Sequence, residues 1–342
     1  MSLALAPFSA LYGVAVRARA ALYRAGVLKS HAVGAPVVSV GNLTVGGTGK
    51  TPLVGWVARA LAAEVKRVCV LTRGYRRADE RRRVVVSDGG RLLADEREGG
   101  DEPRLLAEQL LGMAAVVADA DRVAAARWAA EVLGSQAFVL DDGFQHLRLA
   151  RDLDIVTLDG TDPWGGSRLL PRGRLREPLA NIARAHCVVI TRADLAEDPD
   201  GLRTEVEHLC GDRALVLTSR FRTRRLRPLH PEPDADAPST RPAAAFCALG
   251  NPRAFFAHLR AEGHELAHTH AFPDHHAYTQ KDIEQLTREA EARGARALLT
   301  TAKDAVKLRA LKMKLPCYVV DIEPEIDDAD ALLRLLREAV VK

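Results

Sequence analysis

Long hydrophobic runs, paired cysteines and a strong net charge are all missing from this sequence of 342 residues. Its uncharged start ends at Arg17, too short for the ~20 residues of a transmembrane helix, and no signal-peptide cleavage site follows. The five cysteines are scattered without a CxxC pair, which argues against a zinc site or a disulfide framework and indicates a reducing compartment. Because the net charge is only +4, we expect no nucleic-acid partner, and we infer no obligate protein partner.

Acidic residues are absent before Glu64, although six basic residues precede it. Residues 3–28 are rich in Ala, Leu, Val and Tyr and predict one or two helices, with apolar side chains on one side and Arg17 and Arg24 on the other. Arg19 falls within the apolar arc. Such a helix lies in a membrane interface with its arginines at anionic headgroups, or it packs on its own domain. This segment alone does not decide between the two.

The segment from Pro36 to Thr51 reads PVVSVGNLTVGGTGKT, and the rest of the chain is organised around it. A short β-branched strand leads into a glycine-rich loop and then into a helix expected over about residues 52–63. In such a loop the backbone N–H groups and the helix N-terminus surround a polyphosphate, the lysine reaches the β- and γ-phosphates, and the hydroxyl ligates Mg²⁺. The sequence therefore predicts a nucleoside-triphosphate site made by Gly46, Gly47, Thr48, Gly49, Lys50 and Thr51.

Two adjacent aspartates, Asp141 and Asp142, follow a predicted strand over residues 137–140. P-loop proteins hold Mg²⁺ with an acidic residue at the end of a strand, opposite the hydroxyl of the loop. We expect Asp142 to be the metal carboxylate and Asp141 to be its neighbour or a member of the surrounding shell. A solvated turn is the alternative, and the glycine-rich loop upstream disfavours it.

Arginines mark two further segments. Arg73 follows a predicted strand over residues 68–72, and at the carboxyl end of a strand in an α/β sheet a side chain points into the ligand crevice. A loop over residues 164–178 carries four arginines among glycines and prolines. This loop binds an anion or a headgroup, or it is simply solvated.

Two other segments carry groups that transfer protons. Asp101 stands at the start of a predicted helix, where the N-cap is its ordinary role. Asp274, His275 and His276 lie in a proline-containing loop, where imidazoles that titrate near neutrality are free to reach a site. A zinc site in this loop lacks a third and a fourth ligand at usable spacing.

Strand and helix signals alternate along the chain, which predicts an α/β fold: a P-loop NTPase-like, mostly parallel sheet flanked by helices. Residues 222–242 are dense in Pro, Arg and Asp and have little to bury, so they predict a linker. We divide the chain into an N-terminal membrane-interface helix (1–30), a P-loop kinase core (31–222), a linker (223–242) and a smaller C-terminal α/β subdomain (243–342). Whether the last helix packs on the second domain or returns to the first stays open.

Seven motifs occur in order along the chain: SVGNLTVGGTGKTP, LTRGYRR, GDEP, DDGFQH, PRGRLREP, FPDHHAYT and TTAKDAVK. In these motifs the sequence resembles the tetraacyldisaccharide 4′-kinase family, over essentially its whole length. The resemblance implies transfer of the γ-phosphate of ATP, with Mg²⁺, to the 4′-hydroxyl of an acylated glucosamine disaccharide 1-phosphate, a step in the lipid A biosynthesis of Gram-negative bacteria. It also favours the membrane-interface role of the N-terminal helix, and so a peripheral protein on the cytoplasmic face of the inner membrane.

The resemblance also implies roles for residues in the matching motifs. Asp101 and His275 form the dyad that activates the acceptor hydroxyl, and Lys50 binds the phosphates as the third catalytic residue. His275 is chosen over His276 because of the Asp-His pair in the motif. Mg²⁺ is held by Thr51, Asp142 and Asp141. The substrate and phosphate cleft is lined by Arg73, Arg122, Glu177, Gln145 and His146.

The alternative is a P-loop GTPase or metallochaperone built on GGxGKT, with the TRAD segment at residues 191–194 reading guanine and the histidines delivering metal. Two residues weigh against it. Val45 stands where related deviant P-loop ATPases carry a signature lysine, and Arg192 stands where a guanine-reading loop has lysine.

Overall fold

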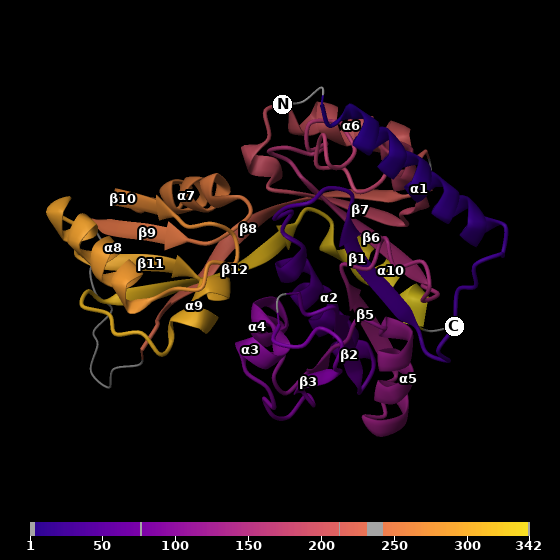
Figure 1. Cartoon of the computed structure of the whole chain (residues 1–342), viewed down its shortest axis with the longest axis horizontal. Helices are drawn as coiled ribbons and strands as arrows, with labels where there is room; N and C mark the ends of the chain where they lie inside the picture. The colour runs from indigo at the N-terminus through magenta and orange to yellow at the C-terminus, as the bar shows by residue number, and fades with distance from the viewer. Residues whose placement is uncertain (1–3, 76, 212, 231–241, 341–342) are drawn as a thin grey trace. The chain divides into compact units, whose positions relative to one another are not determined.

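The computed structural model describes residues 4–75, 77–211, 213–230 and 242–340 and divides the chain into two compact units (Figure 1). Unit 1 comprises Met1–Arg220 and Pro324–Lys342, and unit 2 comprises Phe221–Glu323. Two strands, β8 (Leu215–Pro228) and β12 (Cys317–Ile326), run from one unit into the other. The predicted linker at 223–242 therefore begins inside a strand, and its residues 231–241 lie outside the described part of the chain.

Unit 1 is built on a sheet with the strand order β8-β7-β6-β1-β5-β2-β4-β3. The strands before β8 are β1 (Val37–Asn42), β2 (Val68–Thr72), β3 (Val84–Ser87), β4 (Ala114–Ala118), β5 (Ala137–Asp141), β6 (Leu153–Asp159) and β7 (Cys187–Thr191). Neighbours from β8 to β4 pair in parallel, and only β3 runs antiparallel to its partner β4. The prediction of a mostly parallel sheet is confirmed.

Side chains that alternate along each strand build a separate core on each face of this sheet. Val38 and Val40 of β1 pack into a cluster with α2 (Lys50–Glu64), α4 (Asp101–Gln109) and α10 (Ala329–Val340). Val37 of the same strand faces the opposite cluster, which contains the apolar side chains of α5 (Arg122–Val132). Because both faces are covered, the strands read as continuous apolar runs rather than as alternating ones.

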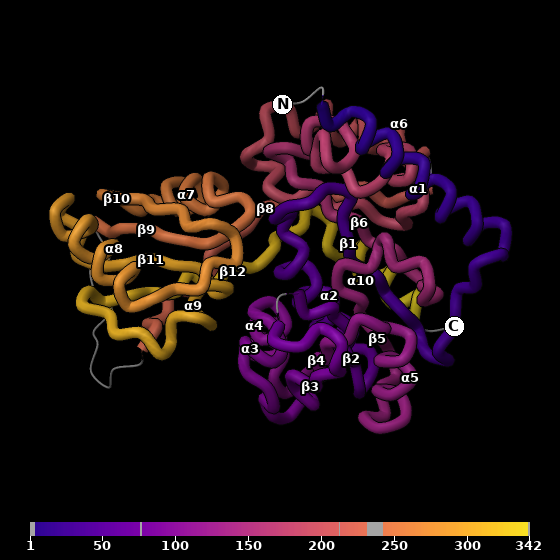
Figure 2. Tube along the Cα trace, in the orientation of Figure 1, coloured from indigo at the N-terminus to yellow at the C-terminus, as the bar shows by residue number. Residues whose placement is uncertain are grey.

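The last helix belongs to unit 1, which settles the question left open by the sequence. α10 contacts α2 and β1, and its Leu332 and Leu336 are buried in the same cluster as Val54 of α2. Figure 2 shows the yellow trace of α10 beside the indigo trace of β1, although the two segments are nearly 300 residues apart in the sequence. The remaining helical segments of unit 1 are α3 (Glu96–Gly99), η1 (Leu179–Arg184), η2 (Ala193–Leu195) and α6 (Pro199–Cys210).

The N-terminal helix α1 (Ala6–Arg24) is attached to unit 1 by one narrow side. Ser9 Oγ donates to the carbonyl of Leu169 over 2.8 Å, and Gly13 is the one buried residue of the helix. None of the helices in the described residues is both long enough and apolar enough to span a bilayer.

Unit 2 has the strand order β10-β9-β11-β12-β8, in which β10 (Leu266–Ala271) is the edge strand. β10, β9 (Ala243–Cys247), β11 (Ala297–Thr301) and β12 pair in parallel. Its helices are α7 (Pro252–Ala261), α8 (Gln280–Ala292) and α9 (Ala302–Leu308). A capping box starts α8: Thr279 accepts from the N–H of Asp282, whose side chain accepts from the N–H of Thr279.

Candidate active site

The glycine-rich loop follows β1 at the carboxyl edge of the unit 1 sheet. β1 and β5 are parallel neighbours in which Val40 pairs with Asp141, so the loop and the two aspartates start from adjacent strand ends. Gly46 and Gly49 have φ values of 128° and 76°, a backbone region that glycine enters without strain. Gly49 is the N-cap of α2, which starts at Lys50 rather than at the predicted Pro52. The loop therefore has the conformation that turns backbone N–H groups towards an anion.

The side chain of Thr48 anchors this loop to the strands beneath it. Its hydroxyl accepts from Nδ2 of Asn42 over 3.0 Å and shares a 2.8 Å hydrogen bond with the hydroxyl of Thr157. The hydroxyl of Thr191 donates to the Thr48 carbonyl over 2.9 Å. Thr48 thus supports the loop through a buried network on β1, β6 and β7, and nothing local in the sequence pointed to Asn42, Thr157 or Thr191.

A compact charge cluster lies beside the loop. Lys50 Nζ is 2.5 Å from Asp142 Oδ1, and the guanidinium of Arg176 donates to both oxygens of the same carboxylate at 2.8 Å. Although burial alone would raise it, the two cations hold the pKa of Asp142 below its usual range. Arg176 belongs to the arginine-rich loop, so one of that loop's four arginines does bind an anionic group, here the site's own carboxylate. Asp142 is ionised and in contact with the P-loop lysine.

Asp141 differs sharply from its neighbour. Its carboxylate is 5% exposed and accepts a 3.0 Å hydrogen bond from the hydroxyl of Thr72. Burial, together with the charges of Glu102 and Asp142 and against that of Lys50, raises the pKa of Asp141 to about 6. Two adjacent carboxyls thus have opposite shifts, because Asp142 is paired with cations and Asp141 is desolvated.

The donor set at this edge fits Mg²⁺. The hydroxyl of Thr51 in the first turn of α2 and the carboxylates of Asp141 and Asp142 are hard oxygen ligands, which Mg²⁺ prefers. Asp142 holds a proton only weakly, and it contacts Lys50. One of these oxygen ligands therefore lies where the charge of a triphosphate bound to the loop would be neutralised.

Two predicted substrate residues are ionisable groups behind this edge, one buried and one half-buried. Arg122 in α5 is 5% exposed, and burial lowers the pKa of its guanidinium, while the charge of Asp141 opposes that shift. Burial, and then the charge of Arg122, lowers the pKa of His146 to about 4, so this imidazole is neutral near pH 7. Arg122 Nε and His146 Nε2 are both buried without a hydrogen-bond partner, which leaves polar atoms for a ligand to satisfy.

The other predicted substrate residues have different surroundings. Arg73 follows β2, as predicted, and its guanidinium lies over the ring of Tyr75, 4.7 Å from the centroid. The side-chain amide of Gln145 donates to the main-chain carbonyl of Asn42 over 2.9 Å, and the main-chain carbonyl of Gln145 accepts from Arg19 over 3.1 Å. Arg19 therefore contacts the site as well as interrupting the apolar arc of α1.

Glu177 serves the scaffold in this structure. Its side chain is 6% exposed and accepts from Asn181 Nδ2 over 2.6 Å and from Arg184 NH2 over 3.1 Å. The Arg184 guanidinium lies 4.4 Å from the centroid of the Phe144 ring, next to the DDGFQH turn. Glu177 thus fixes that turn, in addition to lying at the edge of a cavity.

A cavity of about 130 Å³ opens between α1 and the loops that carry the charge cluster. The hydroxyl of Tyr12 donates to the Arg176 carbonyl over 2.8 Å across this gap. The cavity is lined by Tyr12, Val16, Arg19, Ala20, Gln145, Leu147, Arg176 and Glu177. Half of its wall comes from the N-terminal helix and half from residues beside the glycine-rich loop.

Asp101 is the first residue of α4, and its expected N-cap role is wrong. Gly100 occupies the N-cap with φ 96°, which only glycine adopts readily, and no side chain caps the helix. Asp101 Oδ1 instead accepts from the N–H of Glu102 over 2.9 Å. The carboxylate therefore lies in the first turn of the helix, where the helix dipole stabilises its charge.

The two loop histidines of unit 2 are held differently. His276 lies 3.1 Å from Asp282 Oδ2 and stacks on Phe272 with the ring centroids 4.7 Å apart. His275 has a left-handed backbone with φ 63°, and its Nε2 is 3.8 Å from Asp274 Oδ2. His276 thus has packing and pairing that explain its presence, whereas the strained backbone is at His275. Asp101 and His275 belong to different units, so their pairing stays a prediction.

Comparison with known proteins gives one consistent result. A model of the tetraacyldisaccharide-1-P 4′-kinase family matches residues 1–341. A tetraacyldisaccharide 4′-kinase of Geobacter metallireducens is 43% identical over 340 residues, covering 96% of this chain and 95% of the relative. One of Anaeromyxobacter sp. (strain K) is 46% identical over 313 residues, covering 90% and 80%. The crystal structure of LpxK from Aquifex aeolicus in complex with ATP is 34% identical with a TM-score of 0.79, covering 99% of each chain.

Proposed function

The chain belongs to the tetraacyldisaccharide-1-P 4′-kinase family, and on that premise we propose how its residues carry out the reaction. The activity is transfer of the γ-phosphate of ATP to the 4′-hydroxyl of an acylated disaccharide 1-phosphate in lipid A biosynthesis. The observation that carries the assignment of roles is the contact of Lys50 and Arg176 with Asp142 beside the glycine-rich loop.

Phosphate binding falls to the loop from Gly46 to Thr51. Its backbone N–H groups and the N-terminus of α2 hold the phosphates, and Lys50 turns from Asp142 towards the β- and γ-oxygens when ATP enters. Bound Mg²⁺ supplies neutralisation of the phosphate charge, and Thr51, Asp142 and Asp141 are the residues that would hold it. Arg176, released from part of its pairing, remains as a second fixed cation beside the phosphates.

The acceptor hydroxyl has to lose a proton, and we assign that proton to the dyad of His275 and Asp101. An imidazole accepts a proton near pH 7, and a carboxylate beside it orients the ring and stabilises its charged form. The two residues come from the two units of the chain. Closing of the units around both substrates would assemble the base, which keeps ATP from reacting with water before the lipid has bound.

The lipid substrate is recognised, in this proposal, beside the cavity under α1. Its disaccharide carries a phosphate, for which Arg73 and Arg122 offer charge, while Gln145, neutral His146 and Glu177 offer hydrogen bonds to sugar hydroxyls. This placement is supported by the cavity lining, which joins residues of α1 to Gln145, Arg176 and Glu177.

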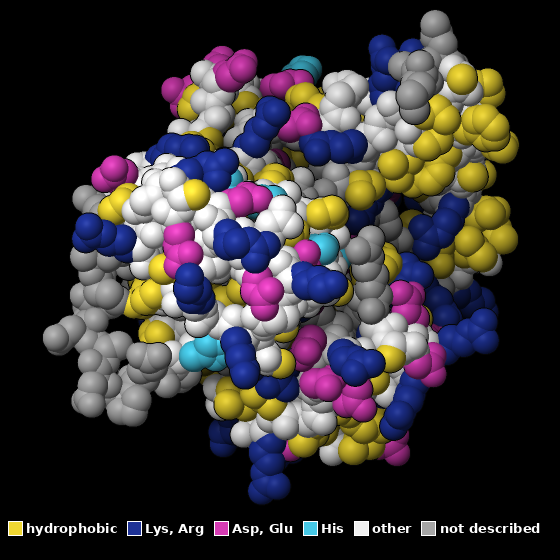
Figure 3. Space-filling model, turned by 60° about the vertical axis from the view of Figure 1, so that its left-hand side comes forward, with side chains coloured by type: hydrophobic (Ala, Val, Ile, Leu, Met, Phe, Trp, Pro, Cys, Tyr) yellow, Lys and Arg dark blue, Asp and Glu magenta, His cyan; other side chains and the backbone are white. Residues whose placement is uncertain are grey.

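We also propose that α1 holds the protein on a membrane surface. Large apolar side chains on its outer side are strongly exposed: Phe8 62%, Leu11 69% and Val14 61%. On a helical wheel Arg17 borders this strip, where it would meet anionic headgroups. Figure 3 shows hydrophobic side chains gathered at the upper right of the face drawn, whereas elsewhere on it charges of both signs alternate.

Because ATP is cytoplasmic, this membrane surface is the cytoplasmic face of the inner membrane. Phe8→Asp with Leu11→Asp should abolish co-sedimentation with anionic vesicles. Val132→Asp, which alters another exposed apolar residue, should not. Retention of the α1 variant on the vesicles would move the anchor elsewhere.

The catalytic roles are tested by transfer of label from γ-labelled ATP to a tetraacylated disaccharide 1-phosphate in mixed micelles containing Mg²⁺. Wild type should label the lipid, and Asp142→Ala should not, although it folds. Release of labelled phosphate from GTP without any labelled lipid would favour the P-loop GTPase alternative, against which family membership already speaks. Unimpaired labelling by Asp142→Ala would remove the charge cluster from the mechanism.

A further inference from the structure

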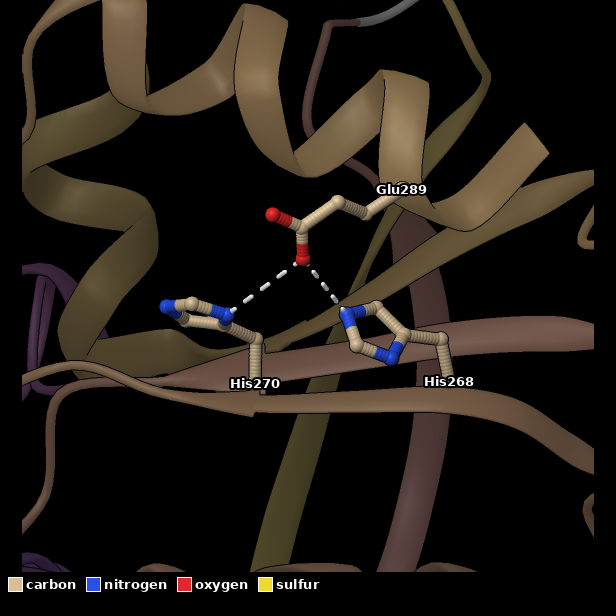
Figure 4. A group of neighbouring side chains, drawn as sticks. All are labelled: His268, His270 and Glu289. Carbon is tan, nitrogen blue, oxygen red and sulfur yellow. Dashed lines mark ion pairs between the residues drawn. The ribbon is translucent and has the colours of Figure 1, made fainter. Parts of the chain in front are cut away.

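Unit 2 contains a group of metal-ligating side chains that the kinase reaction does not use. His268 and His270 are two residues apart on β10, so both side chains leave the same face of this edge strand. α8 packs against β10, and its Glu289 reaches down to the two imidazoles (Figure 4). In the described residues this is the one group of three or more such side chains whose ligand atoms all lie within 4.8 Å of one another.

The distances suit a small first-row ion. His268 Nε2 is 3.2 Å and His270 Nδ1 is 4.0 Å from the same oxygen of Glu289. In a tetrahedral zinc site, ligand atoms about 2 Å from the metal are separated by about 3.3 Å. One of the three pairs of ligand atoms already has this separation, and a rotation of the half-buried Glu289 side chain would shorten its distance to His270. All three ligand atoms lie within 4.8 Å of one another. Figure 4 shows both imidazoles and the carboxylate pointing into the same space.

The contact between His268 and Glu289 is not a well-aligned hydrogen bond. His268 Nε2 is buried and lies 3.2 Å from a Glu289 oxygen, with which it forms an ion pair of poor hydrogen-bond geometry. An imidazole nitrogen that faces a carboxylate oxygen in this way can turn a proton or a lone pair towards it. A lone pair and a carboxylate oxygen facing each other at this distance are stabilised by a cation between them.

We propose that His268, His270 and Glu289 form a binding site for a divalent first-row transition metal of the Zn²⁺ type. Two imidazoles and one carboxylate select such an ion over Mg²⁺ and Ca²⁺, which prefer oxygen ligands. The site leaves at least one coordination position for water or another ligand. It is separate from the oxygen-ligand set around Thr51 and Asp142 in unit 1.

The site would brace the loop that carries His275. β10 ends at Ala271 and α8 begins at Gln280, so the metal joins the strand before the loop to the helix after it. Closing the base of a loop lowers its conformational entropy. The ring of His270 also lies 4.4 Å from that of Phe272, on which His276 stacks, so one ligand packs directly on the loop. The relevance to catalysis rests on the proposed role of His275; the metal site itself does not.

The test is titration of tag-free, full-length protein with Zn²⁺ in excess Mg²⁺, and with Co²⁺, whose visible absorption reports coordination by imidazole. We expect one Zn²⁺ per chain at this site. His268→Ala and Glu289→Gln should each weaken binding by at least ~100-fold, because loss of even an outer-shell partner costs 10–100-fold. Glu284→Gln, an exposed acid on the same helix, is the matched control and should bind as wild type does.

Arg293 provides a variant that should change affinity in the opposite direction. Its charge acts on His268, and it donates to the main-chain carbonyl of Glu289 over 2.9 Å. Arg293→Gln should therefore tighten Zn²⁺ binding several-fold. If the three side chains only formed ion pairs with one another, the same substitution would not increase Zn²⁺ binding. Zn²⁺ should also slow hydrogen exchange over residues 272–279 in wild type and not in His268→Ala.

Two outcomes would overturn the proposal: no saturable Zn²⁺ binding, or binding that His268→Ala and Glu289→Gln leave unchanged. Metal binding with an inactive kinase would contradict the proposed function alone. An active kinase that shows no saturable Zn²⁺ binding would contradict this inference alone.

Discussion

The neighbouring carboxyls Asp141 and Asp142 should affect stability in opposite directions. Burial raises the pKa of Asp141 to about 6, whereas Lys50 and Arg176 hold that of Asp142 below its usual range. A raised carboxyl pKa contributes stability that is fully present below the unfolded pKa and is lost as the pH rises through the folded pKa. A depressed one contributes stability that is present above the unfolded pKa and is lost as the pH falls through the folded pKa.

The magnitude for Asp141 follows from the shift. A rise from 3.8 to about 6 is about two pKa units at ~1.4 kcal/mol each, so ionised Asp141 costs unit 1 about 3 kcal/mol at pH 8. Asn at this position cannot ionise and still accepts the hydrogen bond from Thr72. Asp141→Asn should therefore raise the free energy of unfolding by up to about 3 kcal/mol at pH 8 and by about half of that at pH 5.

Asp142→Asn should lower the free energy of unfolding instead. The substitution leaves Lys50 and Arg176 close together without their counter-charge, which costs 3–5 kcal/mol in a fully buried pair. Because these side chains are 12–22% exposed, we expect about 2 kcal/mol here.

Urea unfolding followed by tryptophan fluorescence measures both effects, without nucleotide or Mg²⁺. The three tryptophans, Trp56, Trp128 and Trp164, all lie in unit 1, so the signal reports the unit that carries the site. Asp141→Asn should also lose most phosphoryl transfer, since a stabilising change at a functional charge removes function. Equal destabilisation by both variants, or a pH-independent effect of Asp141→Asn, would refute the electrostatic reasoning.

Three further predictions concern residues that support the site. Thr191→Val removes a hydrogen bond to the Thr48 carbonyl, which contributes about 1 kcal/mol. The substitution should therefore raise KM for ATP about fivefold, with kcat little changed. Glu177→Gln weakens the ion pair with Arg184 and should lower the free energy of unfolding of unit 1 by about 1 kcal/mol in urea. Unchanged stability together with lost lipid binding would leave Glu177 with its substrate role alone. His276→Ala removes the stack on Phe272, which stabilises the loop by about 1 kcal/mol, and should speed hydrogen exchange over residues 272–279. The kcat of this variant should stay within a few-fold of wild type.

Local patterns were sufficient to predict much of the fold. The β-branched run before the glycine-rich loop, the loop itself and the acids after β5 depend on neighbours in sequence, and the structure places all three at one sheet edge. The boundary at residue 223 was less predictable, because arginines in β8 pair with acids of β12 that lie about 100 residues away: Arg227 with Asp321, for example. Within residues 222–228, the charged composition that indicated a linker belongs to the exposed side of a paired strand.

Side-chain partnerships could not be predicted in the same way. Arg176 was one of four arginines in its loop, and only the fold brings it to Asp142, 34 residues upstream. Asn42 and Thr191 support Thr48 across strands that meet only in the folded sheet. Asp101 lost its predicted N-cap role because Gly100 takes the unusual backbone conformation at that position.

The central claim is that Asp101 and His275, from different units, act together as one base, and a double-mutant cycle on kcat tests it most directly. Asp101→Ala and His275→Ala should each lower kcat by roughly 10²–10⁴-fold without changing the unfolding of unit 1. The double variant should be no slower than the worse single one, because either change alone disables the pair. Losses that multiply in the double variant would contradict the dyad and leave each residue with a separate role.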